Sequence, residues 1–189
     1  SWDYHLMINE FRRHPKVCGW LYTEHHDVIN EWNGYWRYDR SEKFTGLSEL
    51  VPGMTLKDWH SPFYLATERE MCREVKPGEA IDVPLYVSFM TDADVGESLK
   101  LRLELYGWDS LGRRETYVRD ERQFSYEPWM NRELEPLRLQ MPDKPVLAVL
   151  SLVLEDQAGA ILHRNFTTYL VSRGISKRDE KVSSGGENL

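Results

Sequence analysis

The sequence predicts a mainly β protein, in which an immunoglobulin-like β-sandwich follows one helix and one strand. Apolar and polar residues alternate over residues 81–89 and again over residues 99–105. This period of two is typical of half-buried antiparallel strands. Residues 146–154 are almost continuously apolar, which indicates a strand at the centre of a sheet, covered on both faces.

Turn-forming stretches separate these runs. Each stretch carries a glycine close to a proline or an aspartate: residues 76–79, 109–112 and 156–159. Turn-forming stretches at this spacing predict about seven or eight short strands, which we assign to a sandwich over residues 61–172. Residues 173–189 contain few apolar side chains, so we expect a disordered tail there.

The first part of the chain reads differently. Residues 1–14 predict an amphipathic helix that Pro15 ends. Its apolar stripe consists of Tyr4, Met7, Ile8 and Phe11. The apolar run at residues 17–22 then predicts a buried strand. Helix followed by strand is half of an α/β unit, and a (β/α)8 barrel needs roughly 250 residues. Residues 1–60 are therefore predicted as the last helix, strand and exit loop of a truncated barrel.

Charge and composition exclude several classes of function. The net charge is −7, and no basic cluster interleaved with aromatic residues suggests a nucleic-acid partner. No stretch approaches the roughly 18 apolar residues of a membrane span, so we expect no membrane partner. Cys18 and Cys72 lie in strand-like contexts, where small buried thiols are expected. The sequence leaves open whether they pair, and leaves the cellular compartment open as well.

A short stretch of the chain carries a family resemblance. Residues 14–24 read HPKVCGWLYTE, and Asp27-Val28 follow. This stretch resembles the last barrel helix and the eighth strand of family 2 glycoside hydrolases. Asn33-Gly34-Tyr35 and the stretch 38–43 (YDRSEK) resemble the segment that leaves the barrel, with Glu42 in place of the usual proline. The resemblance covers residues 5–171 in domain order, and its specific motif covers residues 12–43.

The resemblance implies a retaining glycosidase that acts on β-linked sugars such as β-galactosides or β-glucuronides. It places the two catalytic glutamates on the fourth and seventh strands, upstream of Ser1. We therefore expect no catalytic residue in this chain and no cofactor, and a carbohydrate substrate only for the full-length protein. Asn9-Glu10 copies the family's dipeptide but falls within the helix, where a solvated carboxylate is expected. The alternative is a non-catalytic sandwich that binds carbohydrate or protein.

Four residues are the candidate contacts with substrate. Glu24 stands at the end of the predicted strand and Asp27 just beyond it, where barrel geometry places groups that face the active site. Each is expected either to contact sugar hydroxyls or to cap a loop or form an ion pair. Trp20 and Tyr22 offer aromatic faces to a sugar or pack at an interface, and the same holds for Trp32 and Trp36.

Two further expectations concern ligands and partners. His25 and His26 are adjacent, and neighbouring side chains of an extended chain point to opposite sides, so we expect no metal site. The apolar stripe of the helix at residues 1–14 lacks the cover that a barrel would give it. The stripe therefore predicts either homo-oligomerisation or docking onto the sandwich.

Overall fold

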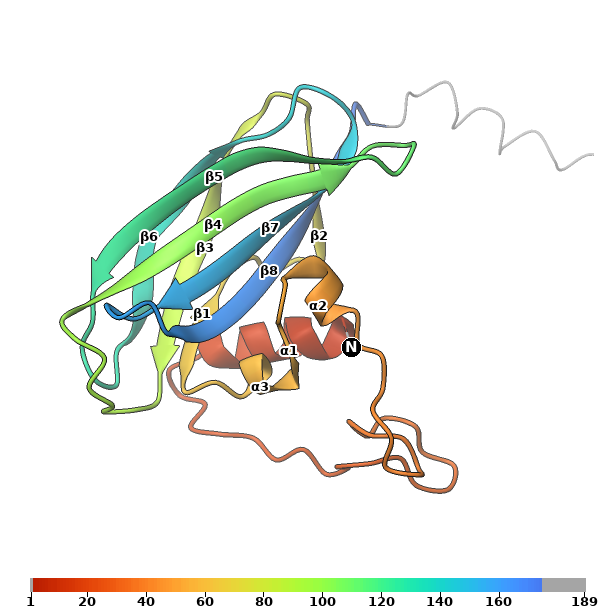
Figure 1. The fold of residues 1–189 in the computed structure, drawn as a ribbon, viewed down its shortest axis with the longest axis vertical. Helices are drawn as coiled ribbons and strands as arrows, with labels where there is room; N and C mark the ends of the chain where they lie inside the picture. Colours follow the sequence, from red (N-terminus) through yellow and green to blue (C-terminus); the bar gives the residue numbers. More distant parts are fainter. Residues whose placement is uncertain (1, 175–189) are drawn as a thin grey trace, which may run out of the picture.

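The computed structural model describes residues 2–174 of the chain (Figure 1). Three helices come first: α1 (Trp2–Arg13), α2 (Leu47–Leu50) and α3 (Leu56–Trp59). Eight strands follow: β1 (Phe63–Ala66), β2 (Cys72–Val75), β3 (Ala80–Phe89), β4 (Ser98–Trp108), β5 (Arg114–Ser125), β6 (Asn131–Gln140), β7 (Val146–Glu155) and β8 (Ile161–Val171). The chain is mainly β, as predicted. None of the helices within residues 2–174 has the length and apolar character needed to cross a membrane.

The strands form two sheets. One has the order β1-β3-β6 and the other the order β2-β8-β7-β4-β5. Neighbouring strands run antiparallel, except that β2 pairs with β8 in parallel. The predicted central strand is confirmed, because β7 lies in the middle of the larger sheet. The three predicted turns also form, with Gly78, Gly112 and Gly159 in left-handed conformations that favour glycine.

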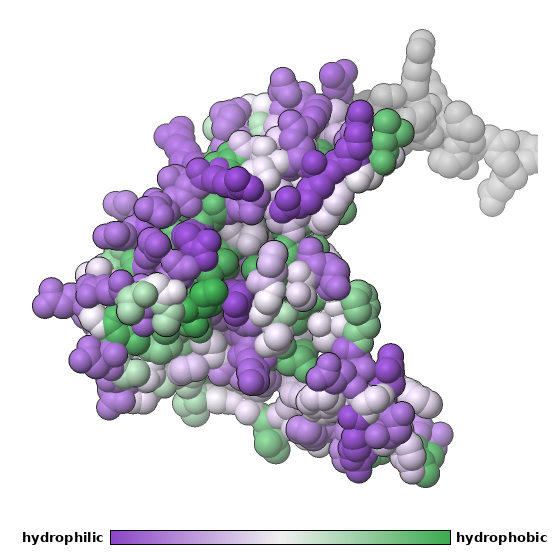
Figure 2. Space-filling view, viewed as in Figure 1, coloured by the Kyte–Doolittle hydropathy of each residue, from purple (hydrophilic) through white to green (hydrophobic). Residues whose placement is uncertain are grey.

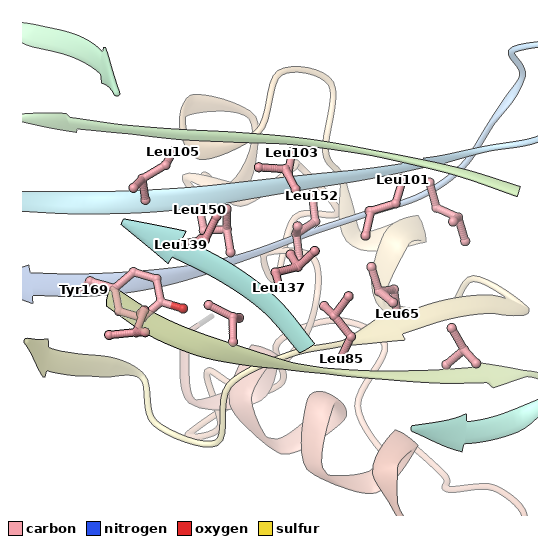
Figure 3. Packing of buried hydrophobic residues seen from close by; sticks show 14 of the residues in the cluster. Leu65, Leu85, Leu101, Leu103, Leu105, Leu137, Leu139, Leu150, Leu152 and Tyr169 are labelled. Carbon is pink, nitrogen blue, oxygen red and sulfur yellow. The ribbon is translucent and has the colours of Figure 1, made fainter. Parts of the chain in front are cut away.

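The main core lies between the sheets. Alternate residues of β3 and β4 point inward, so that Leu85 faces Leu101 and Leu103 across the gap (Figure 3). Leu150 and Leu152 of β7 fill the middle of the same layer. Each buried leucine contributes about 1.5–3 kcal/mol relative to an exposed one. The period-two pattern of the sequence thus maps onto one buried face per strand.

A second core joins the helices to the outer faces of the strands. Its buried members come from α1, α2, α3, β1, β4, β7 and β8, and include Ile8, Leu47, Trp59, Tyr64, Tyr106, Val149 and Phe166. Ile8 is fully buried, whereas Met7 remains 41% exposed. Docking onto the sandwich therefore buries Ile8 and partly buries Tyr4 and Phe11, whereas Met7 of the stripe stays exposed (Figure 1). An oligomer that forms through this helix stays a prediction.

The predicted buried strand at residues 17–22 does not form in this chain. Leu21 is 86% exposed and Val17 is also exposed. Within the described part of the chain, no backbone hydrogen bond joins residues 18–24 to another segment. The backbone is extended but lacks the neighbouring strand that a ladder requires. The structure therefore contains the helix of the expected helix–strand unit without a paired strand.

The environment predicted for the two cysteines is also wrong. Cys18 and Cys72 are both exposed and both free. Cys18 lies in the unpaired segment and Cys72 opens the edge strand β2, so neither is covered by a second layer. Of the predicted tail at residues 173–189, residues 175–189 lie outside the part that the structure describes.

Candidate functional site

The second part of the segment that carries the family resemblance lies in a small protruding unit, residues 25–44, which we call the knob. Isolated bridges join His26 to Trp36, Trp36 to Glu42, and Val28 to Glu31. Two tight turns close these pairings, with the non-glycine residues Asn30 and Arg40 at φ 72° and 71°. Figure 1 shows the knob projecting away from the sheets, below the helical layer.

Asp27 is the centre of the knob. Its side chain is buried, and its Oδ1 atom accepts hydrogen bonds from the Gly34 backbone N–H, at 3.0 Å, and from the Lys43 ammonium group. Lys43 also donates to the Trp32 carbonyl oxygen at 2.9 Å. The Asp27 carboxylate is thus occupied inside the protein, which corresponds to the loop-capping, ion-paired alternative for this residue.

Gly34 permits this arrangement because it has no side chain. A Cβ atom at this position would lie 2.2 Å from the His26 carbonyl carbon and 2.4 Å from the Asp27 nitrogen. Both neighbours are backbone atoms, so a larger residue at position 34 would push the backbone at Gly34 away from the backbone at His26 and Asp27.

Gly34→Ala is therefore expected to open the knob while leaving the sandwich folded. Hydrogen exchange should accelerate at the Asp27 and Trp36 amides, which bond within the knob. Gly19→Ala is the matched control, because a Cβ at Gly19 has no neighbour within 4 Å. Unchanged exchange in Gly34→Ala would contradict the contact.

Glu24 lies beside Glu31 at the base of the knob. The pKa of Glu24 is raised above its ordinary value, first because its carboxyl group hydrogen-bonds with that of Glu31, and then through burial and the negative charge of Asp27. The Oε2 atom of Glu24 is buried and accepts no hydrogen bond.

Tyr22 and Trp20, the two aromatic residues predicted to contact sugar, instead pack between the knob and the helices. Tyr22 stacks on Tyr35 with ring centroids 4.2 Å apart, and Tyr4 of α1 meets both rings edge-on. Trp20 lies near Phe11 at 5.9 Å and over the Arg12 guanidinium at 5.1 Å. Asp27 therefore lies in the knob and Glu24 immediately before it, while Trp20 packs against the helical layer.

Three exposed rings surround a hollow on the knob. Trp32 is 76% exposed and Phe44 80%, and Tyr38 is exposed as well. They line a hollow of about 620 Å³ together with Asp27, Arg37, Asp39 and Lys43. Sequence reasoning included Trp32 but missed Tyr38 and Phe44. Their only signal was the lack of apolar periodicity around them, which argues against a core position.

The surroundings of the knob are polar. Figure 2 shows it as a lobe on which hydrophilic residues predominate, with apolar patches at its margin. Among residues 2–174, no three histidine, cysteine, aspartate or glutamate side chains gather in a way that could hold a metal ion. The ring of His25 instead stacks near Trp36, with centroids 6.3 Å apart.

Comparison with known proteins does not assign the chain to a family. No protein-family model matches the chain, and no curated protein matches its sequence. One similar solved structure is the superoxide reductase (neelaredoxin) from Ignicoccus hospitalis, with 12% identity, a TM-score of 0.39, and coverage of 58% of this chain and 82% of that one. Another is the sporulation control protein Spo0M from Bacillus subtilis, with 15% identity, a TM-score of 0.39, and coverage of 59% and 49%.

A third similar structure is a protein described as a β-galactosidase from Bacteroides fragilis. It has 16% identity and a TM-score of 0.35, and the match covers 59% of this chain but 16% of that one. Likenesses this remote carry no functional argument. The two sheets are established by their own strand pairing.

Proposed function

We propose that this chain is the C-terminal, non-catalytic part of a retaining glycoside hydrolase that acts on β-linked sugars. In this proposal the sandwich and its helical layer support a catalytic barrel whose two carboxylates lie upstream of Ser1. Residues 1–60 contribute the last helix, the last strand and the exit loop of that barrel. The chain alone is inactive.

The observation that carries the proposal is the convergence of the resemblance motif on Asp27. Three separate pieces of that motif are Asp27 itself, the Asn33-Gly34 pair, and the stretch that ends at Lys43. The Gly34 amide and the Lys43 ammonium group both donate to the same buried carboxylate. The residues that carry the resemblance therefore belong to one local structure.

The unpaired segment adds support. Exposure alternates along it: Trp20, Tyr22 and Glu24 are partly buried, whereas Leu21, Thr23 and His25 are exposed. A segment with this alternation, with an exposed Leu21 and no backbone hydrogen bonds to a neighbour, has the character of a strand edge without its partner. The last strand of a barrel would be unpaired in this way when its neighbouring strands belong to another part of the protein.

Hydrolysis assays test the proposal. The 189-residue chain is expected to leave aryl β-galactosides and aryl β-glucuronides intact. The protein encoded by the whole reading frame should cleave one of them with retention of anomeric configuration. Hydrolysis by the chain alone would contradict the proposal, and so would a reading frame that encodes no second part with paired glutamates.

A second candidate function is saccharide binding by the chain itself, and the hollow on the knob favours it. Exposed aromatic rings stack on the apolar faces of sugars, and charged groups beside them bind the hydroxyls. Trp32, Tyr38 and Phe44 supply rings, while Arg37 and Asp39 supply polar groups.

Glycan affinity electrophoresis of the chain distinguishes the two functions. If the hollow binds saccharide, migration should slow in a gel that contains the right glycan, and Trp32→Ala should abolish the shift. Trp129→Ala is the control, because Trp129 is an exposed tryptophan outside the knob. An equal loss of the shift in both variants would exclude the hollow as the site.

A further inference from the structure

Arg12 is a buried cation whose hydrogen-bonding capacity is only partly used. It lies in the last turn of α1 and is 5% exposed. Its guanidinium lies 5.1 Å from the ring centroid of Trp20 and 5.0 Å from that of Tyr64. Its Nη2 group donates to the Ser61 carbonyl oxygen at 2.7 Å, whereas Nε and Nη1 have no acceptor.

The neighbouring Arg13 shows what a satisfied buried arginine looks like here. It is also buried, but it donates to a Glu10 carboxylate oxygen at 3.1 Å and to the Glu68 carbonyl oxygen at 2.7 Å. Arg12 takes part in none of the ion pairs found within residues 2–174. A buried charge without a counter-ion is strongly unfavourable. A negatively charged partner would therefore stabilise the buried guanidinium of Arg12.

The side chains next to Arg12 also present donors. The His163 ring lies 4.3 Å from the Tyr64 ring, and its Nδ1 atom accepts from the Leu65 backbone N–H at 3.2 Å. Nδ1 is therefore unprotonated, and the neutral ring carries its proton on Nε2. That Nε2 atom is buried and makes no hydrogen bond of good geometry, and the same is true of the Tyr64 hydroxyl, although the Asp58 backbone lies near His163 and the Asn165 side chain near Tyr64.

The charge of this cluster is positive. Burial, aided by the charge of Arg12, lowers the pKa of His163 to about 3, so His163 is neutral at physiological pH. The same cation lowers the pKa of His60 at the surface, after burial. Most of the buried side-chain polar atoms without a partner in the described part of the chain belong to Arg12, Tyr64 and His163. Each can donate a hydrogen bond.

We propose that Arg12, Tyr64 and His163 form a binding site for a small inorganic anion of halide size. Unused donors next to a buried positive charge match an anion, because a water molecule satisfies donors but leaves the charge uncompensated. The rings of Trp20 and Tyr64 enclose the guanidinium, which limits the ligand to one or a few atoms. The site is independent of the proposed glycosidase function.

Thermal unfolding at constant ionic strength tests the site. The wild-type chain in sodium bromide or chloride is expected to melt at least about 3 °C higher than in sodium gluconate, after subtraction of the general salt effect measured with Arg12→Met. Tyr64→Phe should reduce the difference, because it removes one donor with little change of volume. Arg13→Met is the matched control and should retain the full difference.

Anomalous scattering from crystals grown in bromide gives a second readout that does not depend on the stability of any variant. A bromide peak in contact with the Arg12 guanidinium is the expected result. The same melting shift in Arg12→Met as in the wild type, or a loss of the shift in Arg13→Met, would overturn the proposal. A bromide-grown crystal with only a water at Arg12 would overturn it as well.

Discussion

Between pH 6.5 and pH 4 the protein is expected to lose several kcal/mol of its free energy of unfolding. His5 and His163 are both buried, and burial lowers the pKa of His5 to about 4 and that of His163 to about 3. In the unfolded chain both return to about 6.5. Each pKa unit corresponds to about 1.4 kcal/mol, so by pH 4 the loss is roughly 3 kcal/mol for each histidine.

The sign follows from proton counting. Because the folded pKa values are depressed, the unfolded chain binds more protons between pH 4 and pH 6.5, and stability falls as the pH falls through that window. Carboxylates with lowered pKa values, such as Glu104 and Glu155, act only below about pH 4.5. The raised pKa of buried Asp58 works in the opposite direction and offsets part of the loss.

The hydrogen bond between Trp59 and His5 is the contact expected to break in acid. His5 accepts a hydrogen bond at Nδ1 from the Trp59 indole N–H at 3.0 Å, and its Nε2 lies 3.1 Å from the Phe166 carbonyl oxygen. Protonation of Nδ1 removes the acceptor and places a charge inside the second core. Urea unfolding at pH 7, 6, 5 and 4.5 measures the loss.

Two variants sharpen this experiment. His163→Gln should reduce the pH dependence to the contribution of His5, whereas His14→Gln, which alters an exposed histidine, should leave it unchanged. A free energy of unfolding that stays constant from pH 7 to pH 4.5 in the wild type would contradict the neutral, buried state of these two histidines.

Ile8→Ala is expected to lower the free energy of unfolding by about 2–5 kcal/mol, as other large-to-small core substitutions do. Ile8 is fully buried among residues of α2, α3, β1 and β8, so its removal leaves a cavity in the second core. The effect would show that α1 is part of the folded unit rather than an accessory arm. Urea unfolding of the full chain measures it.

Met7→Ala is the control for this experiment. Met7 immediately precedes Ile8 in the same helix, but it is 41% exposed and lies outside the second core, so its replacement should change stability by no more than about 0.5 kcal/mol. Equal, small effects of the two substitutions would mean that α1 does not pack on the sandwich in solution.

The strands with one buried face were predictable from the sequence. In β3 and β4 the alternation of large apolar residues with mostly polar ones gives both the strand and its inward side. β7 was placed correctly at the sheet centre because its residues are apolar on both sides. β5 carries many charged residues, as exposed edge strands do, and so lacks a clear alternation.

The unpaired segment could not be predicted, because an apolar run has the same pattern whether or not its partner is present. Leu21 and Val17 are apolar in the manner of buried strand residues, yet the described chain gives them no neighbouring strand. Burial depends on what lies alongside, and that information is absent from the run itself. The same holds for Cys18.

Within the site, position was predictable and contacts were not. Asp27 could be placed just beyond the end of the predicted strand, but its pairing with Lys43 depends on left-handed turns at Asn30 and Arg40. Neither turn contains a glycine, the residue that usually indicates a left-handed turn in a sequence. Arg12 was equally hidden, since a helical arginine normally extends its charge to solvent.

Amide hydrogen exchange at residues 18–24 tests the central claim most directly. In the 189-residue chain these amides should exchange as fast as those of an unstructured peptide, while the amides of β7 stay protected. In the protein encoded by the whole reading frame, the same amides should become protected, because neighbouring barrel strands would then bond to them. Protection of residues 18–24 in the chain alone, or continued fast exchange in the longer protein, would contradict the account.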